Sequence, residues 1–208
     1  MKLDKSLEPF RATLEALQRL LHKFDDQGVI IGGIAVGFLG KPRFTADVDA
    51  VFLLSTQDIP KFVELAREEN ILPRRKDAEE FARKSRVLLL KHRPTETDID
   101  ISLGILPFEE EMVERSEIKS FANLSIRLPT PEDLIIMKAI AHRPKDLEDI
   151  RTIADKYGST VFNGKTIFHH KGHKGHEGKM LVKSVAFPPL CTLCPSWLGS
   201  FPLITGEP

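Results

Sequence analysis

Two aspartates separated by one residue are the strongest chemical feature of the sequence. Asp47 and Asp49 lie in the segment TADVDAVF, where they alternate with apolar residues. Alternate residues of a strand face the same side, so we expect the two carboxylates about 6.6 Å apart on one face. Their repulsion is roughly 2 to 3 kcal/mol at an effective dielectric constant of about 20. A divalent cation offsets it directly, and hard oxygen ligands favour Mg²⁺ or Mn²⁺.

A second acid pair follows the same alternation. Asp98 and Asp100 in TDIDISLG are interleaved with isoleucines, so a neighbouring strand can present a third acid to the same cations. Two such ions can activate an attacking oxygen and stabilise a leaving phosphate. The competing interpretation is simpler, because a single D-x-D on a strand more often lies on a solvated face.

A glycine pair precedes the first acid pair. Gly32 and Gly33 end the apolar run that begins at Val29. A strand-to-helix turn at this point would let backbone amides approach a triphosphate, although adjacent glycines usually only make a turn. A Walker phosphate loop is excluded, since Ala35 and Pro42 stand where that motif needs glycine and serine or threonine.

Hydrophobic periodicity indicates the elements that position these residues. We expect helices at 5–24, from near Ile34, and at 57–70, 134–142 and 146–157, and strands at 29–31, 48–54, 87–91, 99–103 and 124–128. The strands at 87–91 and 99–103 form a predicted hairpin. The pattern predicts an α+β fold, with a small mixed sheet flanked by helices, C-terminal helices and an irregular tail.

Composition limits the class of protein. The chain has 208 residues, of which 41% are hydrophobic and 29% charged, and its net charge is zero. These values suit a folded domain and exclude a wholly disordered chain. No apolar run reaches the roughly 20 residues that cross a bilayer, and the first residues lack an apolar signal core. We therefore expect a cytoplasmic protein with no membrane partner.

The character of the chain changes after Tyr157. We predict a catalytic domain at 1–157 and an irregular, disordered or unrelated tail at 158–208, rich first in glycine, lysine and histidine and then in proline. Cys191 and Cys194, with the preceding histidines, leave a zinc site open as a minor alternative.

The order of motifs resembles the nucleotidyltransferase superfamily of DNA polymerase β type. That order is an apolar strand, Gly32-Gly33, a short helix, TADVD, and an acid on a later strand. Residues 10–157 resemble the minimal nucleotidyltransferases related to abortive-infection and type IV toxin-antitoxin toxins. The segments that carry this resemblance are RFTADVD, RVLLLKH, DISLGILPFEEE and LPTPEDLIIMKAIAHRPKDLEDI.

The resemblance implies roles for individual residues. Asp47 and Asp49 would bind the metals, with Asp100 as the third carboxylate. A second group would contact the nucleotide, and it comprises Gly32, Gly33, Arg43, Thr45 and Lys138. Glycine at position 33 leaves only backbone donors where relatives can carry a serine. A polar cluster is implied between the last helices, at Arg143, Lys145 and Asp146.

The resemblance also implies an activity: transfer of a nucleoside monophosphate from a nucleoside triphosphate to a hydroxyl. The acceptor stays open between RNA such as a tRNA 3′ end, a protein and a small molecule, and an antitoxin protein is a further implied partner. A basic patch at Arg74, Arg75 and Lys76 could serve an RNA acceptor. The alternative is a degenerate, non-catalytic module that only binds a partner.

Overall fold

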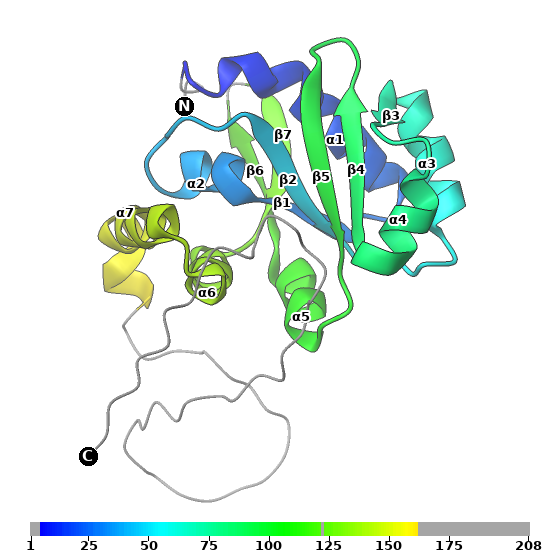
Figure 1. Ribbon diagram of the computed structural model, residues 1–208. Coiled ribbons are helices and arrows are strands. Elements are labelled where there is room, and N and C mark those ends of the chain that lie inside the picture. Colours follow the sequence, from blue (N-terminus) through cyan, green and yellow to red (C-terminus); the bar gives the residue numbers. More distant parts are fainter. Residues whose placement is uncertain (1–4, 122, 162–208) are drawn as a thin grey trace, which may run out of the picture. The chain divides into compact units, whose positions relative to one another are not determined.

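The acid-bearing segments form adjacent strands in the middle of a five-stranded mixed sheet (Figure 1). The computed structural model describes residues 5–121 and 123–161, without the side chains of 159–161. The sheet has the order β1-β2-β5-β4-β3. Its strands are β1 (Gly28–Ile31), β2 (Asp47–Phe52), β3 (Ile71–Pro73), β4 (Val87–His92) and β5 (Thr97–Leu103). The predicted hairpin is confirmed as the antiparallel pair β4 and β5.

The register of the central pair decides which side chains meet. β2 and β5 run parallel, with Asp47 opposite Asp98 and Asp49 opposite Asp100. The residues between the acids point to the other face, where Val48 and Ile99 are fully buried. The alternation seen in the sequence therefore separates an acidic face of the sheet from the main hydrophobic core.

Helices cover both faces of the sheet. On the core face, the leucines of α1 (Arg11–Lys23) and Phe62 of α3 (Ile59–Glu68) pack into one cluster with Phe52. On the acidic face, a smaller cluster joins Val51 to Met112 and Val113 of α5 (Pro107–Arg115). No helix in the described ranges is long and apolar enough to cross a membrane.

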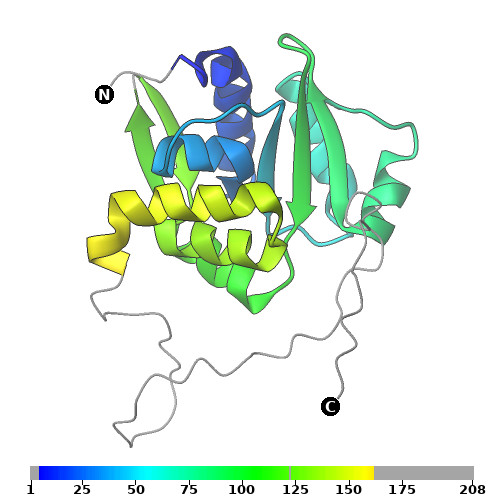
Figure 2. The same ribbon diagram turned by 60° about the vertical axis from the view of Figure 1, so that its left-hand side comes forward.

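Three helices contact one another beside the sheet. Figure 2 shows α6 (Pro131–Ala141) and α7 (Pro144–Val161) side by side, with α2 (Gly32–Leu39) next to them. Thr130 caps α6, because its hydroxyl accepts a hydrogen bond from the backbone N–H of Asp133. α2 begins at Gly32, two residues before the predicted start near Ile34, so the glycine pair forms its first turn.

Several short elements were not predicted from the sequence. They are β3, α4 (Ala78–Ser85), α5 and β6 (Glu117–Phe121), which pairs with β7 (Leu124–Leu128). β3 has three residues and ends in a proline, and the buried residues of α4 are only Ala78, Ala82 and Ser85. Segments with so few large apolar side chains carry a weak periodic signal. Residues 158–161, predicted as the start of the irregular tail, continue α7. The rest of the predicted tail, with its cysteines, lies outside the described residues.

Candidate active site

Three carboxylates converge on the acidic face of the sheet. Asp47 and Asp49 project from β2 and Asp100 from β5, and one ligand oxygen of each lies within 4.8 Å of the others. All three side chains are partly buried. The parallel register brings Asp49 beside Asp100 although 50 residues separate them in the chain. The structure thus brings together the three acids that the sequence analysis selected.

The glycine pair lies directly against this cluster. Gly32 has a φ of +67°, which side chains rarely adopt, and a Cβ at this position would clash with the Asp49 carboxylate. A Cβ at Gly33 would lie 2.8 Å from the Thr45 hydroxyl. Both glycines are therefore required by close approach. Thr45 occupies the space that a side chain at position 33 would need.

The negative charges of the three carboxylates are only partly compensated by nearby cations. Burial, together with the charges of Asp47 and Asp100, raises the pKa of Asp49 to about 6, although Lys138 and Arg143 oppose the shift. Burial likewise raises the pKa of Asp100, against a lowering by Arg74. An excess of negative charge on clustered oxygen ligands fits a hard divalent cation, so these side chains suit Mg²⁺ or Mn²⁺.

The loop before β2 is fixed to the cluster and to α7. The Thr45 hydroxyl donates a hydrogen bond to Asp47 Oδ1 at 3.0 Å. The Arg43 guanidinium binds both carboxylate oxygens of Asp149, at 2.7 and 2.9 Å. Between these two anchored residues, the side chain of Phe44 is 88% exposed. Thr45 therefore contacts the cluster directly, and Arg43 is tied to α7. That these two residues line a nucleotide stays a prediction.

Lys138 lies in a buried ion network behind the cluster. Its Nζ is 3.2 Å from Asp146 Oδ1 and 2.9 Å from Asp149 Oδ2, and all three side chains are almost fully buried. Arg143 binds Asp146 as well. The sequence analysis placed Arg143 and Asp146 in a polar cluster but missed Asp149, which lies one helical turn beyond Asp146. Lys145, the third predicted member, is exposed.

On the side of the cluster that faces β3 and β4, the ion pairs involve Asp98 and Asp100. Arg74, which follows β3, donates one hydrogen bond to Asp98 Oδ2 at 2.8 Å and another to Asp100 Oδ1. Lys91 of β4 lies 3.3 Å from Asp98 Oδ1. The sequence analysis assigned Arg74 to a basic surface patch, but its guanidinium faces the acids. The spacing of the sequence holds no signal for this contact, because it depends on β3 being the edge strand.

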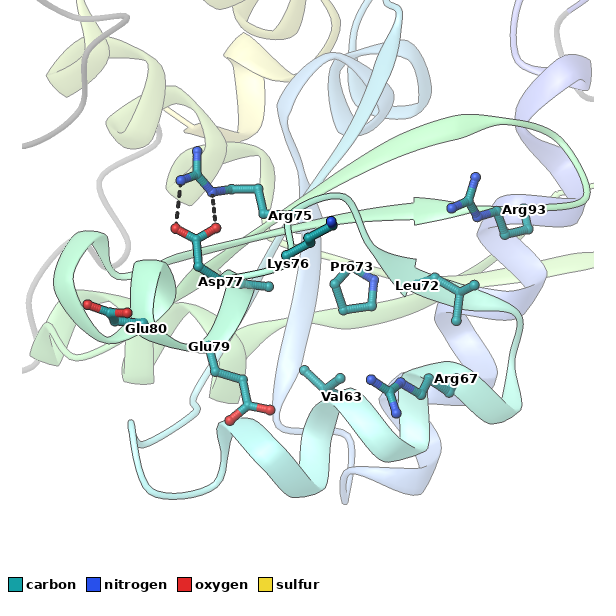
Figure 3. Close-up of a pocket in the computed structure, with 11 residues that line it drawn as sticks. Val63, Arg67, Leu72, Pro73, Arg75, Lys76, Asp77, Glu79, Glu80 and Arg93 are labelled. Atoms are coloured by element: carbon teal, nitrogen blue, oxygen red, sulfur yellow. Dashed lines mark hydrogen bonds and ion pairs between the residues drawn. The ribbon is translucent and has the colours of Figure 1, made fainter.

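A cavity of about 600 Å³ lies beside the same edge, between α3, β3 and α4 (Figure 3). Its lining includes Arg67, Lys76 and Arg93, with Val63 and Leu72 as apolar walls. Arg75 also borders it and forms a two-pronged ion pair with Asp77 (Figure 3). No member of the carboxylate cluster lines this cavity.

Comparisons with known proteins bear on the fold and on the family of the chain. A solved antigenic nucleotidyltransferase-like protein from Paracoccidioides brasiliensis has the same fold, with a TM-score of 0.51 and 17% identity over 73% of this chain and 77% of that one. ANT(2″)-Ia, solved with adenylyl-2″-tobramycin, aligns at a TM-score of 0.48 and 14% identity over 71% and 90% of the two chains. No curated protein matches the sequence. The family model described as "Nucleotidyltransferase of unknown function (DUF6036)" matches residues 9–154, and the chain belongs to that family.

Proposed function

We propose that this protein is a metal-dependent nucleotidyltransferase that moves a nucleoside monophosphate from a nucleoside triphosphate to an acceptor hydroxyl. The observation that carries the proposal is the convergence of Asp47, Asp49 and Asp100 at the first turn of α2. A metal-binding carboxylate cluster next to a helix N-terminus offers a place for both the cations and the phosphates of a nucleotide.

The three carboxylates would hold Mg²⁺ or Mn²⁺. A bound ion of this kind neutralises phosphate charge and makes the attacking oxygen more nucleophilic. The predominance of carboxylate oxygens argues for hard cations over zinc. Within the cluster, Asp47 and Asp49 of β2 would hold the ions, with Asp100 of β5 as the third carboxylate.

The reaction forms one bond and breaks one. The acceptor oxygen bonds to the α-phosphorus, the bond from that phosphorus to the bridging oxygen of the β-phosphate breaks, and pyrophosphate leaves. The hydroxyl proton passes to a carboxylate oxygen of Asp100. Burial raises the pKa of Asp100 above the usual value of a carboxyl group, which suits a group that accepts a proton during turnover.

The remaining residues would position the triphosphate. The first turn of α2, at the positive end of the helix, lies against Asp49 and Thr45. The backbone amides of Gly32 and Gly33 and the Thr45 hydroxyl would contact the phosphates there. Arg43 and Lys138 would act while anchored to Asp149, so their charges are fixed in place before the nucleotide arrives. Such preorganisation is an efficient source of transition-state stabilisation.

The proposal extends to the biological setting. The acceptor is an RNA, a protein or a small molecule, and the protein acts in the cytoplasm as the toxin of a toxin-antitoxin or phage-defence system, with an antitoxin as its partner. The resemblance of residues 10–157 to that group of proteins supports this part.

Labelled nucleotides test the activity. Each α-³²P-labelled nucleoside triphosphate is incubated with the protein, Mg²⁺ and cell extract, and the labelled fraction names the acceptor. Asp47→Asn and Asp49→Asn should abolish labelling, while Asp77→Asn, an exposed acid outside the cluster, should retain it. Full labelling by the Asp47 and Asp49 variants would overturn the mechanism.

A degenerate binding module is the second candidate. The observation that favours it is that Arg43 and Lys138 are both held by Asp149 rather than directed only toward the cluster. Calorimetry separates the candidates, since an enzyme should bind a nucleoside triphosphate only with Mg²⁺ present. Metal-independent binding without turnover in any extract would favour the module.

A further inference from the structure

Arg74 forms a bridge between two acids that the proposed reaction uses unequally. Its Nη1 donates to Asp98 Oδ2 at 2.8 Å, and its Nη2 donates to Asp100 Oδ1. Asp100 belongs to the carboxylate cluster, whereas Asp98 does not. The guanidinium of Arg74 thus occupies one oxygen of Asp100, the third of the carboxylates that would bind metal.

The two acids differ in how many cations compensate them. Asp98 also contacts Lys91, which is its direct neighbour across β4 and β5. Arg74 is the one ion-pair partner of Asp100 among the residues that the structure describes. If Arg74 left Asp100, the guanidinium would keep its bond to Asp98, and only the negative charge of Asp100 would lose its partner.

The position of Arg74 allows such a movement. It follows the last residue of β3, a three-residue strand at the edge of the sheet. Its guanidinium reaches across β4 to β5, and about a quarter of the side chain is exposed. By contrast, Arg43 and Lys138, on the other side of the cluster, are held by acids that are almost fully buried.

We propose that Arg74 is the resting counter-ion of Asp100, a positioning residue that a divalent cation displaces from Asp100 while it remains anchored to Asp98. The inference rests on the proposed function. A guanidinium a few ångströms from a divalent cation is repelled by it, and the oxygens of Asp100 cannot serve both fully. Arg74 therefore stabilises the metal-free cluster and lowers the affinity of the cluster for a divalent cation.

Calorimetric titration of Mg²⁺ into the full-length protein tests this directly. Arg74→Gln should bind Mg²⁺ about tenfold more tightly than the wild type at low ionic strength, because a competing charge is removed. Arg75→Gln is the matched control: it removes the next arginine along the chain, which forms a comparable two-pronged pair with the exposed Asp77. Its affinity should stay within about twofold of the wild type.

A double-mutant cycle shows whether Arg74 acts through Asp100. In an Asp100→Asn background, Arg74→Gln should change the Mg²⁺ affinity by less than about twofold, because the competition no longer exists. A tenfold gain that persists in this background would overturn the inference in favour of a general charge effect. Arg74→Lys, which keeps the charge but cannot span both acids, should lie between the wild type and Arg74→Gln.

Thermal unfolding supplies a readout that does not depend on activity. Arg74→Gln should lower the melting temperature in EDTA, and saturating Mg²⁺ should reduce or remove that difference. Equal Mg²⁺ affinity in the wild type and Arg74→Gln rejects this inference alone. Absence of Mg²⁺ binding to the wild type rejects the proposed function and this inference together.

Discussion

The two sides of the carboxylate cluster are held by ion pairs of different kinds. Toward α6 and α7, Asp149 is 2% exposed and binds both Arg43 and Lys138. Toward β3 and β4, Arg74 and Lys91 bind Asp98, whose side chain is 37% exposed. Buried pairs are costly to break, whereas exposed pairs contribute little and exchange readily. We infer that the ion pairs on the first side stay in place when the proposed nucleotide binds, whereas those on the second side can rearrange.

Removal of the central acid of the buried network should have the largest effect. Asp149→Asn leaves Lys138 and Arg43 without their main partner, so we expect the free energy of unfolding to fall by about 3 kcal/mol. Denaturant titration followed by circular dichroism measures the loss. Asp98→Asn, which weakens the partly exposed pairs with Arg74 and Lys91 on the other side, should cost less than about 1 kcal/mol. Similar losses in both variants would contradict a difference between the two sides.

The glycine that contacts the cluster should be the next most sensitive position. Gly32→Ala introduces a Cβ into the Asp49 carboxylate at a φ of +67°. We expect a loss of about 2 kcal/mol in stability, together with weaker Mg²⁺ binding, since Asp49 must move. Gly158→Ala in α7, where a Cβ meets nothing within 4 Å, should instead be neutral or slightly stabilising. A harmless Gly32→Ala would show that Asp49 is not held against this turn.

Neutralisation of Asp49 should stabilise the metal-free protein. Its pKa of about 6 in the folded state lies above the ordinary value of 3.8 for an aspartate, so the folded state binds more protons between these two pH values. Stability of the wild type should therefore fall as the pH rises through about 6, by about 2 kcal/mol relative to Asp49→Asn at pH 7. Unfolding measured in EDTA from pH 4 to 8 checks this, and parallel curves for the two proteins would refute it.

The exposed aromatic of the anchored loop should matter least for folding. Phe44→Ala removes a ring that is 88% exposed, and we expect a change in unfolding free energy within about 0.5 kcal/mol. The anchors on either side, Arg43 and Thr45, stay in place. A loss above 1 kcal/mol would mean that the loop is held by the ring rather than by its two polar neighbours.

The sequence predicted the carboxylates of the cluster better than the residues that form ion pairs around them. Asp47, Asp49 and Asp100 were selected from alternation and from the resemblance, and the structure brings them together. Asp149 was missed because an aspartate on a polar helix gives no sign of its burial. Arg74 was placed on a surface patch because the three-residue β3 was not detected. Both contacts join residues far apart in the chain, where local patterns hold no information.

Local periodicity is what the sequence by itself determined. The alternation of acids and apolar residues, the glycine pair and the helical spacing of leucines each reflect a repeat within one segment, so they can be read without neighbours. Only the tertiary structure decided that β2 and β5 are parallel partners, with Asp49 opposite Asp100. It also decided that Asp100 shares Arg74 with Asp98. Register and ion-pair choice depend on how distant segments pack, since one residue of slippage would turn every carboxylate to the other face.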